Sequence, residues 1–197
     1  MPHMTLLRLR RFLRDESGAM TVELLLVFPL LVFVLMGTVV FFEGFRARAN
    51  SVKATYTIAD ALSREHQEPI TPEYLDNLYR LYAGLLPKER PETMRVTVIE
   101  YDEELDTYDV QWSEVRGAGT RVTNDKLLPV RDQLLPEMYD GEVGIIVETV
   151  NRYSPVFGVG IQPLSIRNTM ILRPRFDRTL CWSTSNDPPW TDANSTC

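Results

Sequence analysis

The sequence predicts an α+β protein in which one long N-terminal helix leads into a small domain with an antiparallel sheet and one or two short helices. Three observations predict this fold. Residues 24–42 form an apolar run without a single charge. A helix-start signal stands at Thr71 and Pro72, where a capping side chain precedes a proline. The later chain holds short runs rich in Ile, Val and Thr, which favour strands.

Composition limits the classes of protein that this chain can belong to. Its 197 residues suffice for one domain with a core plus an anchor, and 44% hydrophobic with 24% charged residues exclude wholesale disorder. The net charge of −6 argues against a nucleic-acid partner, because phosphate binding needs clustered Lys and Arg.

The apolar run 24–42 has the length of a membrane span. Its 19 residues cover about 28 Å as a helix, close to the ~30 Å hydrocarbon core of a bilayer. Leu, Val, Phe and Met dominate it, and only Pro29, Gly37 and Thr38 are less apolar or less helical. We therefore expect a transmembrane helix.

Flanking charge predicts how this helix is oriented. Four arginines precede the run, whereas Arg46 and Arg48 follow it and lead into a mostly acidic domain. The positive-inside bias then places the N-terminus in the cytoplasm and the C-terminal bulk outside. The four preceding arginines are Arg8, Arg10, Arg11 and Arg14.

A cleaved secretory signal is the competing interpretation, since Ala47-Arg48-Ala49 has the shape of a cleavage site. A signal core of about 7–15 residues is shorter than this run, however. Helical periodicity also continues past it and predicts one helix reaching to about Arg64. We expect the apolar stripe that carries this periodicity to pack on the chain's own domain, with a partner helix as the alternative. The stripe consists of Phe45, Ala49, Val52, Tyr56 and Ala59.

The remaining elements follow from turn and strand signals. A helix from Thr71 stops near Pro87, and 124–135 has helical content interrupted by Pro129. Residues 102–106 join two strands as a hairpin. The four expected strands cover 95–101, 108–115, 144–153 and 164–172, and loops cover 155–163 and 183–197.

No residue pattern in the chain predicts catalysis, a cofactor or a metal centre. His66 lies in a polar helix end, where a solvated side chain is the expected state. The acidic cluster at the hairpin lacks EF-hand spacing, so we expect a solvated tip, with loose Ca²⁺ binding as the alternative. That cluster is Asp102, Glu103, Glu104, Asp106 and Asp109.

Two cysteines, Cys181 and Cys197, occur in the C-terminal tail. They match neither a zinc site nor a redox motif. Outside the cytoplasm they can pair, and closing so short a loop stabilises by roughly 3 kcal/mol. Two unrelated thiols are the alternative.

The residues before the apolar run form a processing motif. Residues 14–23 read Arg-Asp-Glu-Ser-Gly-Ala-Met-Thr-Val-Glu, so a basic leader ends at Gly18 and Glu23 is the fifth residue counted from Ala19. This arrangement resembles type IV pilin-like precursors. Together with Pro29 it resembles the TadE-like family of the Tad (tight adherence) pilus system. Residues 150–158 are similar to a Tyr-x-Pro-x-Phe region of such proteins.

The resemblance implies a pilin-like fold and a defined set of partners. A prepilin peptidase would cut between Gly18 and Ala19, and Glu23 would align subunits during assembly. The expected partners are the inner membrane, this peptidase, other pilin-like subunits and the pilus assembly platform, without nucleic acid. The implied location is the bacterial inner membrane, with a periplasmic C-terminal domain and incorporation into the pilus left open.

Departures from the family narrow the expected role. Leu24 stands where major pilins carry Tyr, and the chain is longer than they are, which favours a minor pseudopilin over a fibre subunit. We expect a leader at 1–18, an anchor helix at 19–65 and an outer domain at 66–197. An unprocessed single-span scaffold of a pilus or secretion complex is the alternative, and an extracytoplasmic enzyme or sensor is a third hypothesis.

Overall fold

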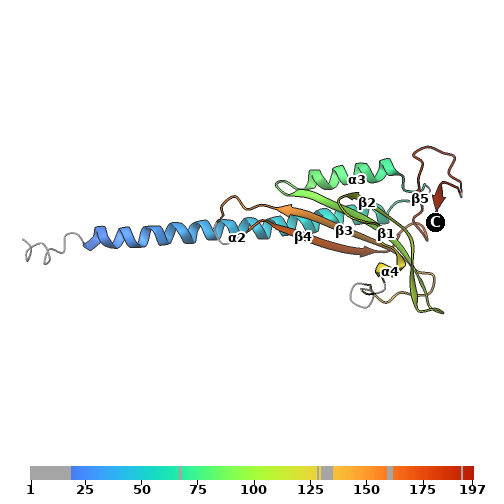
Figure 1. Cartoon of the computed structure of the whole chain (residues 1–197), viewed down its shortest axis with the longest axis horizontal. Coiled ribbons are helices and arrows are strands. Elements are labelled where there is room, and N and C mark those ends of the chain that lie inside the picture. The colour runs from blue at the N-terminus through green and yellow to red at the C-terminus, as the bar shows by residue number, and fades with distance from the viewer. Residues whose placement is uncertain (1–18, 67, 128, 130–134, 159–161, 192) are drawn as a thin grey trace, which may run out of the picture. The chain divides into compact units, whose positions relative to one another are not determined.

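The computed structural model describes residues 19–66, 68–127, 129, 135–158, 162–191 and 193–197. Within them the chain forms two compact units, one of 19–42 with 156–158 and one of 43–155 with 162–197. The element order is one long helix, a second helix, a hairpin, a short helical turn and two further strands (Figure 1). This order is an α+β arrangement, as the sequence predicts.

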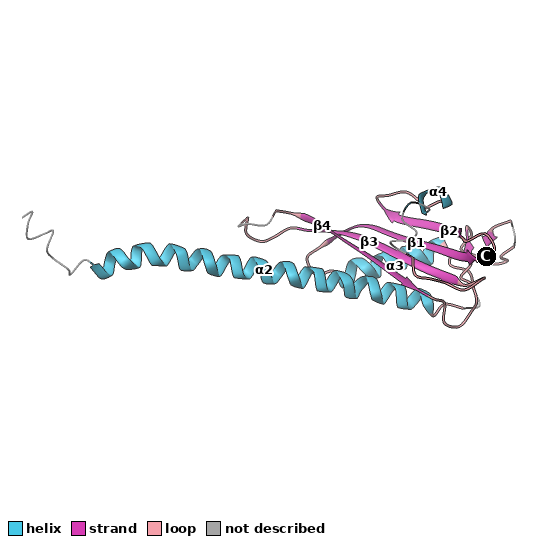
Figure 2. Cartoon of the chain, turned by 90° about the horizontal axis from the view of Figure 1, so that it is seen from below, coloured by secondary structure: helices cyan, strands magenta, loops and turns pink. Residues whose placement is uncertain are grey.

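The long helix α2 spans Ala19–Ser63 without interruption. It ends within one residue of the expected position at Arg64, which confirms the periodicity argument. Pro29 lies inside the helix. The same helix therefore carries both the apolar run and the residues that enter the domain core, and Figure 2 draws it as one cyan element.

The second helix α3 spans Pro72–Leu85 and begins as its sequence signal predicts. The Thr71 hydroxyl accepts a hydrogen bond from the Tyr74 backbone N–H at 3.2 Å. Pro72 occupies the first turn, where its missing N–H costs nothing. The buried face of α3 consists of Leu75, Leu78 and Tyr82.

Four antiparallel strands form the sheet, in the order β2-β1-β3-β4. All four predicted strands and the predicted hairpin are confirmed, and β1 begins five residues before its expected start. Val96 pairs with Val147, and Val98 pairs with Ile145, in the central register. The strands are β1 (Arg90–Asp102), β2 (Thr107–Gly117), β3 (Val143–Tyr153) and β4 (Leu164–Leu172).

Both faces of this sheet are packed. Alternate residues of β1 and β3, such as Val96 and Ile145, join the main core with Ile58 and Leu62 of α2. The opposite face carries a smaller cluster in which Ile99 is fully buried. The remaining buried members of that cluster are Tyr108, Leu127, Met138 and Ile146.

Two predictions for the C-terminal half need correction. The helix α4 covers only Asn124–Leu127, shorter than the expected 124–135, of which 128 and 130–134 lie outside the described residues. The tail is not purely loop, because β5 (Trp182–Ser183) pairs with β6 (Ser195–Thr196). A disulfide joins Cys181 to Cys197 beside this pair, which confirms the predicted pairing.

The predicted packing of the apolar stripe on α2 is wrong for most of its members. Phe45 is 74% exposed and Tyr56 is 49% exposed, whereas Ala59 is buried. The face that meets the sheet instead includes Ser51 and Thr55, both fully buried. Both hydroxyls form hydrogen bonds with side chains of the sheet, so these polar residues can lie on the buried face of the helix.

Candidate functional site

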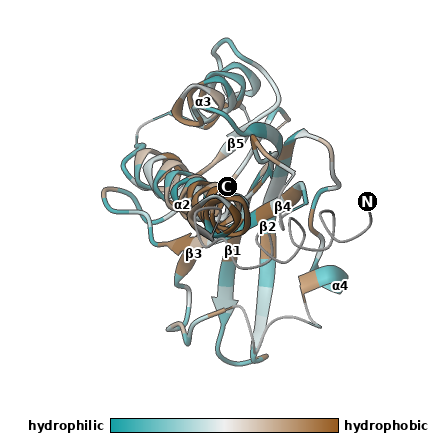
Figure 3. Ribbon diagram, turned by 90° about the vertical axis from the view of Figure 1, so that its left-hand side faces the viewer, coloured by the Kyte–Doolittle hydropathy of each residue, from teal (hydrophilic) through white to brown (hydrophobic). Residues whose placement is uncertain are grey.

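The apolar half of α2 is the most unusual surface in the described chain. Apolar side chains from Leu24 to Phe42 are largely exposed, with Leu35 at 65% and Phe42 at 66%. A core helix of a soluble domain would bury such residues. Within the described residues, α2 is the one helix that is long and apolar enough to cross a membrane. Figure 3, which looks along α2, colours its near turns as hydrophobic.

One of the two expected processing residues is the first described residue of α2. Ala19 is its first residue, and Gly18 lies outside the described part of the chain. Glu23 is exposed and directly precedes the apolar run. Glu23 follows Ala19 by four positions, so the two positions lie on one helix face roughly 6 Å apart along the axis.

The geometry of residues 47–49 argues against a cleaved secretory signal. The helix α2 passes through this segment without a break. Ala47 is only 3% exposed and packs with Tyr153 and Ile166 of the sheet. Cleavage after Ala49 would remove Ala47 from that cluster, so the domain retains its packing only when α2 stays whole.

A small polar cavity of about 60 Å³ lies beside the first residues of α2 that follow the apolar run. The Glu43 carboxylate pairs with the Lys88 ammonium at 2.7 Å on its wall. The buried Tyr153 hydroxyl also lines it, and burial raises the pKa of Tyr153, with Glu43 adding to the effect. The cavity has room for only a few waters.

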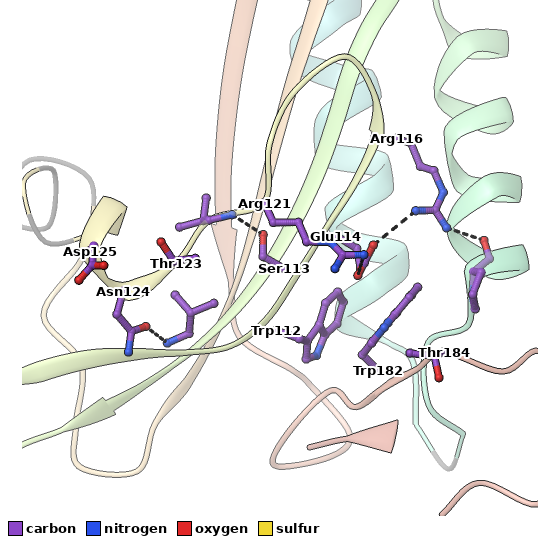
Figure 4. A pocket seen from close by; sticks show the side chains of 13 residues that line it. Trp112, Ser113, Glu114, Arg116, Arg121, Thr123, Asn124, Asp125, Trp182 and Thr184 are labelled. Carbon is purple, nitrogen blue, oxygen red and sulfur yellow. Dashed lines mark hydrogen bonds and ion pairs between the residues drawn. The ribbon is translucent and has the colours of Figure 1, made fainter. Parts of the chain in front are cut away.

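A larger groove of about 890 Å³ runs beside the edge strand β2 (Figure 4). Trp112 and Trp182 form its aromatic wall, with ring centroids 5.6 Å apart. The Trp112 indole N–H donates to the Leu180 carbonyl, so its polar atom points into the domain. The groove therefore offers apolar ring surface rather than a free indole donor.

The charged side chains of this groove bind one another. Glu114 is only 7% exposed, and its carboxylate lies 2.7 Å from the Arg121 guanidinium and 3.8 Å from that of Arg116. Arg116 also pairs with Asp76 and donates to the Pro72 carbonyl at 2.9 Å. Two cations thus compensate the Glu114 carboxylate, so its burial does not leave an unpaired charge at the edge of the domain.

The acidic cluster forms the turn of the β1–β2 hairpin. The Asp102 carboxylate accepts a hydrogen bond from the Leu105 N–H, and Asp109 accepts one from the Asn124 amide. Among the described residues no group of three or more His, Cys, Asp or Glu side chains could hold a metal ion. The solvated tip stays a prediction, with loose Ca²⁺ binding as its alternative. The His66 ring lies tilted against the Phe176 ring, with centroids 5.6 Å apart.

Sequence reasoning missed the polar network under α2. The Ser51 hydroxyl donates to the Asn151 carbonyl oxygen at 2.5 Å and accepts from the Asn168 amide at 2.6 Å. Thr55 and Thr149 share a hydrogen bond of 2.7 Å beside it. These partners lie about a hundred residues apart in the chain. The only signal of the network in the sequence is the presence of polar residues within the predicted strands.

In comparisons with protein-family models, with curated proteins and with solved structures, nothing matches this chain.

Proposed function

We propose that this protein is a membrane-anchored minor pilin-like subunit of a Tad-type pilus assembly system, processed between Gly18 and Ala19. The observation that carries the proposal is the spacing of these residues from Glu23, at the entrance to an exposed apolar run.

Electrostatics gives Glu23 a use in such an assembly. A carboxylate entering a bilayer costs about 2.5–3.5 kcal/mol at the helix centre and less near the interface. Cleavage after Gly18 would create a free amine on each subunit, and that amine can pair with Glu23 of a neighbour. This pairing would compensate the buried charge and set the axial register between helices.

The first experiment determines the mass and N-terminal sequence of the protein recovered from membranes, with and without a prepilin peptidase. We expect a peptidase-dependent start at Ala19. Gly18→Val should block cleavage, whereas Gly37→Ala should not, because a Cβ at Gly37 meets no other atom within 4 Å. An intact chain in the presence of the peptidase would replace this proposal with the unprocessed scaffold.

A second experiment tests the role of Glu23 in assembly. Glu23→Ala should leave cleavage intact and abolish piliation. Glu68→Ala removes an exposed carboxylate elsewhere and should have no effect on either readout. Normal piliation by the Glu23→Ala variant would contradict the assembly role even if the leader is cleaved.

A further inference from the structure

The exposed part of α2 outside the apolar run carries an apolar stripe of its own. Phe45 is 74% exposed, Tyr56 is 49% exposed, Ala49 is exposed and Val52 is partly exposed. We call these four residues the outer stripe. At 100° per residue they point away from Ser51, Thr55 and Ile58, which face the domain core. The described chain therefore leaves this face of the helix without a cover.

The spacing of the outer stripe is that of a coiled-coil seam. Its members follow one another at intervals of four, three and four residues, which places Phe45 and Val52 at d and Ala49 and Tyr56 at a. The stripe covers about 18 Å of helix, too short to hold two free chains together. Two helices anchored in one membrane would meet at a high effective concentration, which removes this limit.

The charges beside the stripe select among possible partners. Arg46 and Lys53 flank it at successive e positions, and Arg48 flanks it at g. None of the three forms an ion pair with another described residue. Farther along the same helix, by contrast, Asp60 pairs with both Arg64 and Arg175. The outer stripe is thus flanked by three positive charges that form no ion pair within the described chain.

This basic flank opposes pairing of the stripe with a second copy of the chain. In a parallel, in-register pair Arg48 of one helix faces Lys53 of the other, and like charges at such positions are destabilising. A helix with Asp or Glu at its own e and g positions would compensate the same three cations.

A membrane surface explains only part of the pattern. Phe45, Arg46 and Arg48 lie close enough to the apolar run to contact lipid headgroups. Tyr56 follows Phe42 by 14 residues, or about 21 Å along the helix, whereas the headgroup layer is only about 5–8 Å thick on each side. Lipid contact therefore leaves Val52 and Tyr56 unexplained.

We propose that the outer stripe docks the helix of a different single-span protein, parallel to α2, with an apolar heptad seam and acidic flanks. This inference rests on the proposed function, because the partner is a second membrane-anchored subunit of the same assembly. The inference adds the face of α2 that the second subunit covers and the acidic charges that the second subunit carries.

The test uses a designed single-span helix as the partner. Its outer part carries Leu at a and d, with either Glu or Lys at e and g, and it is reconstituted with the full-length protein in vesicles of neutral lipid. Energy transfer between dyes on the two chains reports association. We expect the Glu probe to bind at least about tenfold more tightly than the Lys probe.

Two matched variants locate the binding face. Tyr56→Glu should weaken binding of the Glu probe about tenfold or more, whereas Tyr139→Glu, which changes another exposed tyrosine, should not. The double variant Arg46→Glu with Lys53→Glu should reverse the preference in favour of the Lys probe.

Four outcomes would overturn the proposal. Equal binding of both probes would show that the flanking charges do not select the partner. Binding unaffected by Tyr56→Glu would show that the outer stripe is not the binding face. Self-association of the protein that Tyr56→Glu abolishes would identify a second copy as the occupant. Association that requires anionic lipid and ignores both probes would identify a lipid surface. None of these binding results depends on cleavage at Gly18. The N-terminal sequence of the protein tests the proposed function separately.

Discussion

The two halves of α2 share one backbone and differ in what surrounds them. From Leu24 to Phe42 apolar side chains are exposed on nearly every face, whereas from Ala47 to Leu62 one face is buried in the domain. The first half is long and apolar enough to span a membrane, and the second packs on a sheet with matching hydrogen bonds. A continuous helix can thus contain two segments whose stability has different physical sources, and substitutions should separate them.

The largest expected effect is on the first half. Replacing Leu31 and Val34 together by Arg should prevent stable membrane insertion, at a cost of about 5–7 kcal/mol for two central charges. Flotation of the protein with liposomes measures this. Thr57→Arg with Tyr56→Arg adds the same charge to exposed positions of the second half and should leave flotation unchanged. Equal loss of flotation in both double variants would mean that the first half of α2 is not the part that inserts into the membrane.

A substitution in the buried face of the second half should destabilise the domain and spare the anchor. Ile58 is 0% exposed, and Ile58→Ala should lower the free energy of unfolding by about 2–5 kcal/mol. Tyr56→Ala, two residues away and half exposed, should cost about 1 kcal/mol or less. Denaturant unfolding in detergent measures both. Similar costs for the two variants would contradict the assignment of the buried face.

The disulfide should stabilise the domain through its unfolded state. Cys181 and Cys197 are 16 positions apart in the sequence, and the double Ser variant should lose roughly 3 kcal/mol of unfolding free energy. The backbone N–H of Ile70, shortly after α2, donates to the Cys181 carbonyl at 2.7 Å, so the loss should extend to the outer end of the helix. Unfolding with and without reductant measures this, and an insensitive wild type would contradict it.

The smallest effect is a dependence of domain stability on alkaline pH. Burial raises the pKa of Tyr74, and its hydrogen bond to the Glu65 carboxylate raises it further. The unfolded state then loses its proton first, at its ordinary value of about 10. Stability from this group is complete below pH 10 and should fall as the pH rises above it. Tyr74→Phe should flatten that decline, whereas Tyr139→Phe should retain it.

The elements of the fold were predictable because their signals are local. Thr71 and Pro72 mark the start of α3 by capping chemistry, and period-two patterns mark the strands. The length of α2 followed from its periodicity. Its buried face did not, because Ser51 becomes a core residue only through Asn151 and Asn168, which no local pattern connects to it.

The contacts that form the groove beside β2 could not be predicted from local sequence patterns either. Trp112 and Trp182 are seventy residues apart, and neither has a neighbour in the sequence that predicts their contact. Glu114 is a charged residue in a strand run, and only the guanidinium groups of Arg116 and Arg121 allow its burial. Long-range pairing of this kind depends on strand order, which the sequence does not state.

The sequence by itself determined the apolar run of α2, the position of Glu23 before it and the strands of the sheet, because hydrophobicity and periodicity act over a few neighbouring residues. Only the tertiary structure decided which face of α2 meets the domain and which face stays open. That choice depends on hydrogen bonds and close packing between segments distant in the chain. The outer stripe around Tyr56 is exposed because the sheet packs on the face of α2 that holds Ser51 and Ile58.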